Sequence, residues 1–228
     1  MVSNSVAEAL NALCAGLILI SAFGMVATRQ VQGVLRFFIV QSSLLAVSSA
    51  VLGFGRNSLH LWALAAITAA AKVVAIPWVL RRLLPGDYYE RREIAQAVNI
   101  PASLLLALLL TVFSEFLVAP IATAANDTVI RVNLPIGLAG VLIGAYSLMA
   151  RREAIPQLIG ILAMENGAFF AGIAMAPELP IIAELAVAMD VVLIAVVVGL
   201  LTRTIRKTLG TTEAASLSEL KEEPPVWR

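Results

Sequence analysis

Long apolar runs constrain the fold of this chain more than any other feature. A membrane-spanning helix needs about 20 mostly apolar residues, and seven such runs lie between charged or Pro/Gly-containing segments. They are too long for the short alternating strands of an outer-membrane barrel. The sequence therefore predicts an all-α, polytopic membrane protein with about seven transmembrane helices. We expect these helices at Ala9–Thr28, Phe37–Phe54, Leu59–Leu80, Ile100–Ala122, Leu134–Ala150, Ile155–Ala176 and Ile181–Thr202.

The composition agrees with a membrane protein. Apolar residues make up 60% of the 228 residues and charged residues 14%, whereas soluble domains have about 45–50% and about 25%. A formal net charge of +1 argues against nucleic acid as a partner, because nucleic-acid binding needs a clear excess of basic residues. The single cysteine, Cys14, excludes an internal disulfide and an iron–sulfur cluster or structural zinc held by this chain alone.

The basic residues predict the orientation, because cytoplasmic loops carry an excess of Lys and Arg. Of 16 basic residues, 13 fall on the side that includes the C-terminus, whereas Arg56 and Arg131 fall on the other side and Lys72 lies within a run. We therefore expect the N-terminus outside and the C-terminus in the cytoplasm. The charged loop Pro85–Asn99 and the polar tail Thr208–Arg228 would both be cytoplasmic.

Five ionisable residues interrupt the apolar runs and are the candidate site residues. Each costs roughly 2.5–3.5 kcal/mol at a bilayer centre, and such residues usually face the bundle interior and mark ion or proton paths. We therefore consider them a candidate proton path. They are Lys72, Glu115, Glu165, Glu184 and Asp190.

Depth separates these five residues. Glu165 and Asp190 lie near the midpoints of their runs and Lys72 near the middle of its own, whereas Glu115 lies in the outer half and Glu184 nearer the outer end. A buried lysine with a carboxylate can relay protons, or it can be a static pair that only fixes helix register. Both interpretations stay open, and for Glu184 a solvated position is a third.

Backbone-specific residues indicate a tightly packed bundle. Pro77 follows Lys72 by little more than a turn and predicts a kink, because proline removes a helical hydrogen bond. Small residues let membrane helices approach closely. The glycines that predict such contacts are Gly137, Gly140, Gly144, Gly160, Gly167 and Gly172.

Several motifs after residue 131 occur together. The basic turn Arg151–Arg152 precedes the segment LIGILAMENGAFF, Leu158–Phe170; Asp190 follows Leu-Ala-Val-Ala-Met; and ASLSELKE stands at Ala215–Glu222. This part of the chain resembles the three-helix K-type subunit of respiratory complex I and its antiporter relatives. Glu165 stands about one turn later than the buried Glu of that family, and Asp190 replaces a Glu.

With four more predicted helices ahead of this unit, the whole chain resembles the hydrogenase-4 component E family. The expected regions are an N-terminal four-helix membrane region 1–131, the K-like unit 132–207 and the tail 208–228. The resemblance implies a non-catalytic subunit of an oxidoreductase complex in a bacterial or archaeal cytoplasmic membrane. Its partners would be antiporter-like membrane subunits, the hydrogenase large and small subunits and membrane lipid. The nickel–iron centre and iron–sulfur clusters would belong to partner subunits, with no cofactor, metal or catalytic residue in this chain.

The function expected from this resemblance is proton or sodium translocation, coupled to electron transfer in other subunits. Glu165 and Asp190 would carry the ion and Lys72 would modulate their charge. One alternative is a purely structural subunit that anchors the soluble arm and the antiporter-like subunits. Another is a free-standing secondary transporter, which the lack of a repeat between the two halves of the chain disfavours.

Overall fold

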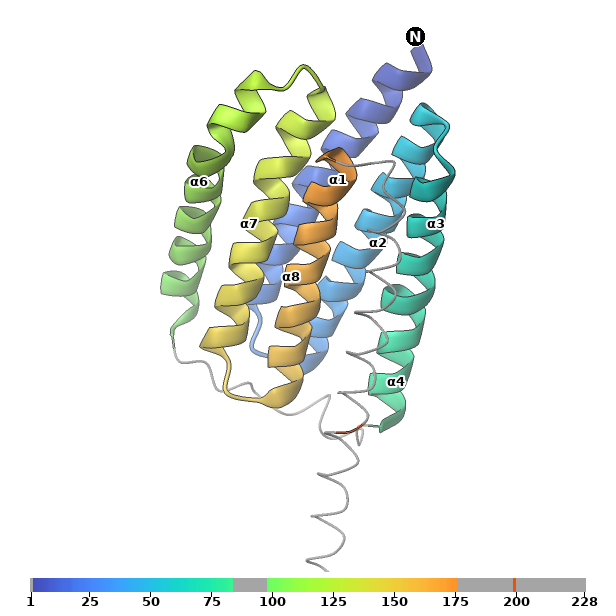
Figure 1. Cartoon of the computed structure of the whole chain (residues 1–228). Helices are drawn as coiled ribbons and strands as arrows, with labels where there is room; N and C mark the ends of the chain where they lie inside the picture. The colour runs from blue at the N-terminus through green and yellow to red at the C-terminus, as the bar shows by residue number, and fades with distance from the viewer. Residues whose placement is uncertain (1, 84–97, 176–198, 200–228) are drawn as a thin grey trace, which may run out of the picture.

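The computed structural model describes residues 2–83, 98–175 and 199, and every element in these ranges is a helix (Figure 1). The helices form six rods that run alternately up and down. The third rod is continuous through α3 (Leu59–Thr68), the π-helix η1 (Ala69–Ala75) and α4 (Ile76–Leu83). The other five are α1 (Val2–Ala27), α2 (Val31–Arg56), α6 (Ile100–Ala124), α7 (Thr128–Ala150) and α8 (Ala154–Met175).

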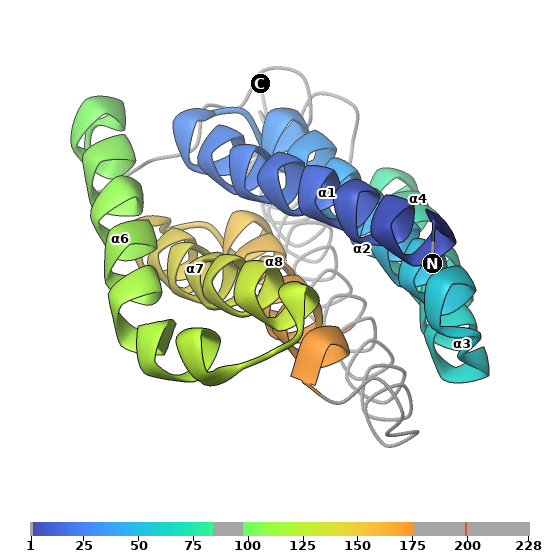
Figure 2. The same ribbon diagram turned by 90° about the horizontal axis from the view of Figure 1, so that it is seen from above.

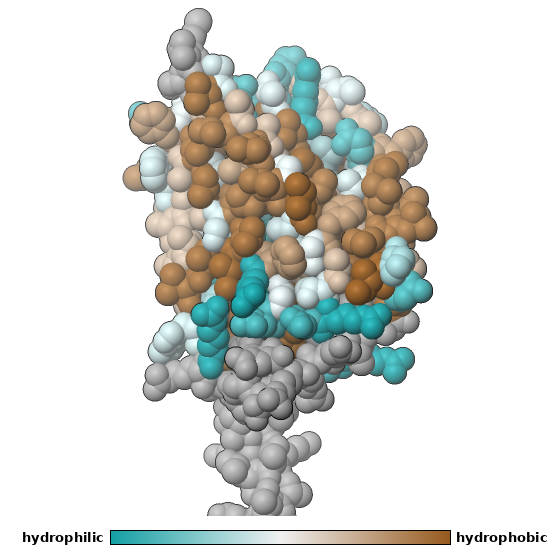
Figure 3. Space-filling view, turned by 180° about the vertical axis from the view of Figure 1, so that it is seen from behind, coloured by the Kyte–Doolittle hydropathy of each residue, from teal (hydrophilic) through white to brown (hydrophobic). Residues whose placement is uncertain are grey.

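All six rods are long and apolar enough to cross a membrane. They confirm the all-helical, multi-pass prediction and match the first six predicted runs. Apolar side chains cover the middle of the face in Figure 3, whereas hydrophilic side chains gather toward the two ends. The seventh predicted run, Ile181–Thr202, lies outside the described residues apart from residue 199, as do Glu184, Asp190 and almost all of the loop and tail predicted to be cytoplasmic.

Three helices begin earlier than the apolar runs predict. α1 begins at Val2, α2 at Val31 and α7 at Thr128, although the runs begin at Ala9, Phe37 and Leu134. A polar residue that caps a helix can extend it beyond the apolar stretch, but Gln30 at the start of α2 makes no side-chain cap hydrogen bond. At α7 the Asp127 carboxylate accepts a hydrogen bond from the backbone N–H of Val129 at 2.8 Å.

Seen from above, the bundle has two layers with α6 at one edge (Figure 2). One layer holds α1, α2 and the third rod, and the other holds α7 and α8. α6 packs mainly against α7 and to a smaller extent against α1. α8 also packs against α2 across the layers, so side chains from both layers meet in the centre.

The closest approach in the bundle is between α7 and α8, as the glycines predict. A Cβ atom on Gly167 would lie 2.5 Å from the backbone nitrogen of Val141 and 2.7 Å from the carbonyl oxygen of Gly137. These distances are too short for any side chain, so the backbones touch directly at this point. This contact fixes the position of α8, which carries Glu165.

Candidate functional site

Lys72 and Glu165 form an ion pair inside the bundle. Lys72 Nζ lies 3.0 Å from Glu165 Oε2, and the side chains are only 1% and 8% exposed. Both residues are candidates from the sequence, and the structure brings them together although 93 positions separate them in the chain. Such a direct ion pair is part of both interpretations of the buried lysine, the proton relay and the static pair that fixes helix register.

The backbone is irregular where it carries Lys72. Residues Ala69–Ala75 form a π-helix, and the backbone N–H of Ile76 bonds to the carbonyl oxygen of Ala71, five residues earlier. Pro77 follows immediately and has no N–H to give the Val73 carbonyl. The sequence predicts a kink at Pro77, and the structure has a π-helical segment just before this residue. π-Helical turns occur frequently at functional sites, and Lys72 is the one buried residue of this segment.

A set of amides and hydroxyls orients the partners of Lys72. Lys72 Nζ donates to Asn166 Oδ1 at 3.1 Å, and Asn166 Nδ2 donates to Ser42 Oγ at 2.8 Å and to Gln41 Oε1 at 3.4 Å. These contacts fix Asn166 so that its oxygen faces the ammonium group. Gln41 Nε2 is buried without a hydrogen-bond partner in the part of the chain that the structure describes. This donor is available to an ordered water.

Phe169 provides a further contact for the ammonium group. Lys72 Nζ lies 4.9 Å from the centroid of the Phe169 ring, within the range of a cation–π interaction. α8 therefore presents a carboxylate, an amide oxygen and an aromatic face to the same lysine, from Glu165, Asn166 and Phe169. The lysine keeps two favourable contacts when the carboxylate is protonated.

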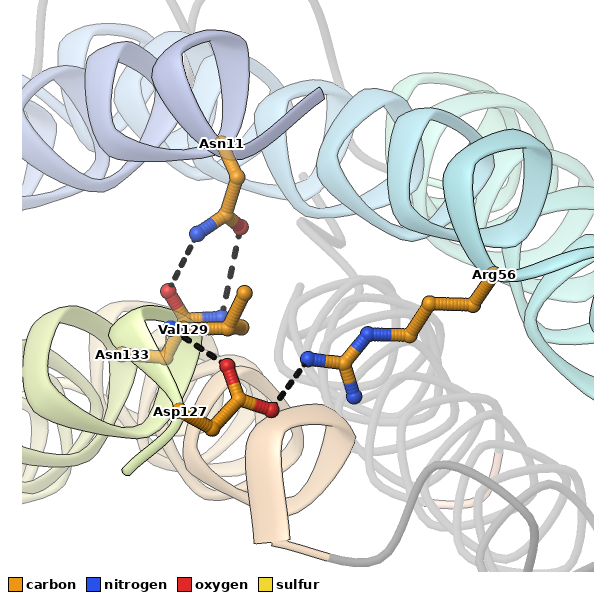
Figure 4. A network of polar contacts seen from close by, with 5 residues as sticks. All are labelled: Asn11, Arg56, Asp127, Val129 and Asn133. Carbon is orange, nitrogen blue, oxygen red and sulfur yellow. Dashed lines mark hydrogen bonds and ion pairs between the residues drawn. The ribbon is translucent and has the colours of Figure 1, made fainter. Parts of the chain in front are cut away.

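A second buried polar cluster is neutral and was not predicted from the sequence. Asn11 Nδ2 donates to Asn133 Oδ1 at 2.7 Å, Asn133 Nδ2 returns a bond to Asn11 Oδ1 at 3.3 Å, and Ser48 Oγ donates to Asn11 Oδ1 at 2.7 Å. Figure 4 shows the paired amides joining α1 to α7. The available signal was an asparagine in each of two apolar segments, because buried amides in membrane helices usually pair across helices.

Arg56 and Arg151 make polar contacts at opposite ends of the bundle. Arg56 and Asp127 form an ion pair at 2.5 Å with side chains 28% and 33% exposed, and Figure 4 shows the Asp127 carboxylate facing Arg56. At the opposite end Arg151 is buried and its guanidinium donates to the Met25 carbonyl, at the end of α1. Burial lowers the pKa of Arg151 to about 10, so the side chain stays charged at neutral pH.

The other sequence candidates are placed differently. Glu115 is exposed on α6 and does not join the Lys72–Glu165 pair, whereas Glu184 and Asp190 lie outside the described residues. Within residues 2–83 and 98–175 no three His, Cys, Asp or Glu side chains are grouped as metal ligands would be. Two of the five candidates are thus joined in one site.

Comparison with known proteins places the chain among relatives of matching length. No family model and no solved structure matches it. An uncharacterized protein of Mycobacterium tuberculosis is 26% identical over 220 residues, 96% of this chain and 100% of that relative. Hydrogenase-4 component E of Escherichia coli is 27% identical over 212 residues, 91% of this chain and 95% of the relative, and the Shigella flexneri protein of that name matches equally. These matches support the resemblance drawn from the sequence: the chain is a distant homologue of hydrogenase-4 component E.

Proposed function

We propose that this chain is an integral membrane subunit of a hydrogenase complex related to hydrogenase-4, and that the Lys72–Glu165 pair takes part in proton translocation. The first part rests on the curated homologues and on six helices able to span a membrane. The second rests on one observation, an ion pair at 3.0 Å buried among these helices. The electron-transfer chemistry and its nickel–iron and iron–sulfur centres would belong to other subunits.

The surroundings of the pair support a change of charge at Glu165. Removing a buried charge from its partner is costly when nothing replaces the partner. Protonation of Glu165 leaves Lys72 with the Asn166 oxygen at 3.1 Å and the Phe169 ring at 4.9 Å. Lys72 therefore keeps both contacts when Glu165 is protonated, which supports a carboxyl that takes up and releases a proton.

Several finer features belong to the same proposal. The C-terminal end would face the cytoplasm of a bacterial or archaeal cell, and Asp190 and Glu184 would extend the proton path beyond Glu165. The neighbours would be antiporter-like membrane subunits that carry the path onward. Sodium in place of protons is the alternative ion, since a carboxylate can bind either.

The test is to replace Glu165 with glutamine in the assembled complex. The variant Glu165→Gln keeps the size of the side chain and an oxygen acceptor for Lys72, but it cannot be deprotonated. We expect an intact complex with at least a tenfold lower rate of proton translocation into inverted membrane vesicles, measured together with hydrogen turnover. Glu8→Gln is the matched control, because Glu8 is a half-buried carboxylate near the beginning of α1.

A purely structural role for the pair predicts another outcome. The variant would then lower the yield of complex, or leave both yield and translocation unchanged. Full translocation per hydrogen turned over in Glu165→Gln would refute the relay. Repeating the assay with and without sodium distinguishes the two ions.

A further inference from the structure

We infer that the exposed face of α6 is an interface with a transmembrane helix of another subunit, and that this helix presents a basic side chain to Glu115. The observation is a carboxylate on the outside of a helix that is otherwise apolar. Glu115 is exposed and has no hydrogen-bond or ion-pair partner among the residues the structure describes. Its neighbours Val112 and Phe116 are 60% and 78% exposed.

The position of Glu115 along α6 excludes contact with water at the membrane surface. At about 1.5 Å per residue, Glu115 lies about 13 Å from the last residue of the helix, Ala124, and about 22 Å from the first, Ile100. A helix of this length extends only a few ångströms beyond a hydrocarbon core of about 30 Å. A glutamate side chain is too short to reach the interface from that depth, so lipid alone would leave the carboxylate among acyl chains.

α6 is also the least covered helix of the bundle. Only 17% of the membrane-spanning stretch of α6 is buried inside the bundle, whereas 39–61% of the corresponding stretch is buried in the other five candidate spans. Figure 2 shows α6 at the edge of the bundle, where it packs against α7 and, to a smaller extent, α1, and its other side faces outward. The buried stripe is narrow and made of small or medium residues: Ser103, Ala107, Ser114, Val118 and Ala122.

Charge complementarity identifies the partner as a helix with Lys, Arg or His at the depth of Glu115. Charged groups inside a membrane pair with one another or line a water-filled cavity. A second copy of the described helices does not supply such a group. Within them Lys72 is buried against Glu165, and the other basic residues, among them Arg36, Arg56 and Arg131, lie within two turns of a helix end. The partner is therefore a different membrane subunit, and this identification rests on the proposed membership of a complex.

The test uses photo-crosslinking in the native membrane. A photoreactive amino acid is placed at Val112 or Phe116 of a tagged chain, and at Val47, which is 50% exposed on α2, as the matched control. We expect the α6 positions, and not Val47, to crosslink to a membrane-spanning segment that carries a basic residue, identified by mass spectrometry. Crosslinks to a second copy of the chain, to a segment without a basic residue or to lipid alone overturn the inference.

Variants of Glu115 test the charge itself. Glu115→Lys should lower the amount of partner subunit that co-purifies at least tenfold, and an acidic residue at the partner's basic position should restore it. Glu115→Leu suits a lipid-facing helix, so the chain should accumulate normally while losing its partner to a similar extent. Normal co-purification in both variants overturns the inference. If partner subunits co-purify equally with the wild-type chain and with the Glu115 variants, only this interface is refuted. If no partner subunit co-purifies with the wild-type chain, the proposed complex itself is refuted.

Discussion

Replacing Lys72 with methionine tests whether the buried ion pair stabilises the bundle as a unit. The variant Lys72→Met keeps the length of the side chain but leaves the Glu165 carboxylate, 8% exposed, without its ammonium partner at 3.0 Å. Removing one partner of a buried pair costs about 3–5 kcal/mol. In a chain of this size about 1 kcal/mol shifts the unfolding midpoint by about 2–4 °C, so we expect a decrease of about 6–20 °C.

The double variant Lys72→Met/Glu165→Gln should recover most of this loss. Both charges are then absent, and replacing a whole buried pair by neutral groups is often nearly neutral in stability. The remaining loss of stability comes from Asn166 Oδ1, which no longer accepts a hydrogen bond from Lys72. A buried polar group without a partner costs about 1–3 kcal/mol. The double variant should therefore unfold within about 2–12 °C of the wild-type midpoint and clearly above Lys72→Met.

The assay is gel filtration of the fluorescently tagged chain after heating in one mild detergent, which reports the folded fraction at each temperature. Arg56→Met is the control, because it breaks a pair whose side chains are 28% and 33% exposed and such pairs contribute at most about 1 kcal/mol. Equal midpoints for Lys72→Met and the double variant, or for Lys72→Met and Arg56→Met, would refute the reasoning.

Two further variants test the packing around the site by the same thermal assay. Gly167→Ala should destabilise the chain by about 1–3 kcal/mol, because the new Cβ would lie 2.5 Å from a backbone atom of α7. Gly16→Ala is the control and should have almost no effect, because nothing lies within 4 Å of the added Cβ. Equal unfolding midpoints for the two variants would contradict the close helix contact. Asn133→Ala removes both hydrogen bonds to Asn11. It should lower the free energy of unfolding by about 0.5–2 kcal/mol, as the loss of interhelical hydrogen bonds in membranes does. A decrease as large as that of Lys72→Met would contradict the distinction between the neutral and the charged cluster.

The six described rods could be predicted from the sequence because each contains a stretch of apolar residues long enough to cross a bilayer. The helix ends could not, since helical structure begins outside the apolar runs, in one case at a polar cap. Asp127 is an example, because its carboxylate begins α7 six residues before the predicted start. An apolar run indicates which residues lie in the membrane, whereas a capping residue indicates where the helical hydrogen bonding begins.

The candidate site was only partly predictable. Depth along each run predicts that Lys72 and Glu165 lie at similar levels, but not that they touch, because this depends on which helices are neighbours and on how η1 turns Lys72 inward. Asn166, Gln41 and Ser42 were not candidates from the residue pattern alone, since neutral polar residues are common in membrane helices. Glu115 shows the opposite case: an intramembrane charge predicts an interior position, and the structure places it on the outer face of α6.

The two buried polar clusters of this bundle differ in what they can do. Asn11 and Asn133 exchange hydrogen bonds between amides, which neither gain nor lose a proton at ordinary pH, so this cluster can hold α1 against α7 but cannot change its charge. The Lys72–Glu165 pair is made of titratable groups, and in the proposed relay Asn166 and Phe169 would keep their contacts with the lysine when Glu165 is protonated. Because the close Gly167 contact fixes α8 next to α7, a proton arriving at Glu165 would alter the contacts of Lys72 on the third rod before it could move α8. The irregular segment η1 is therefore where we expect a change of charge to become a change of structure.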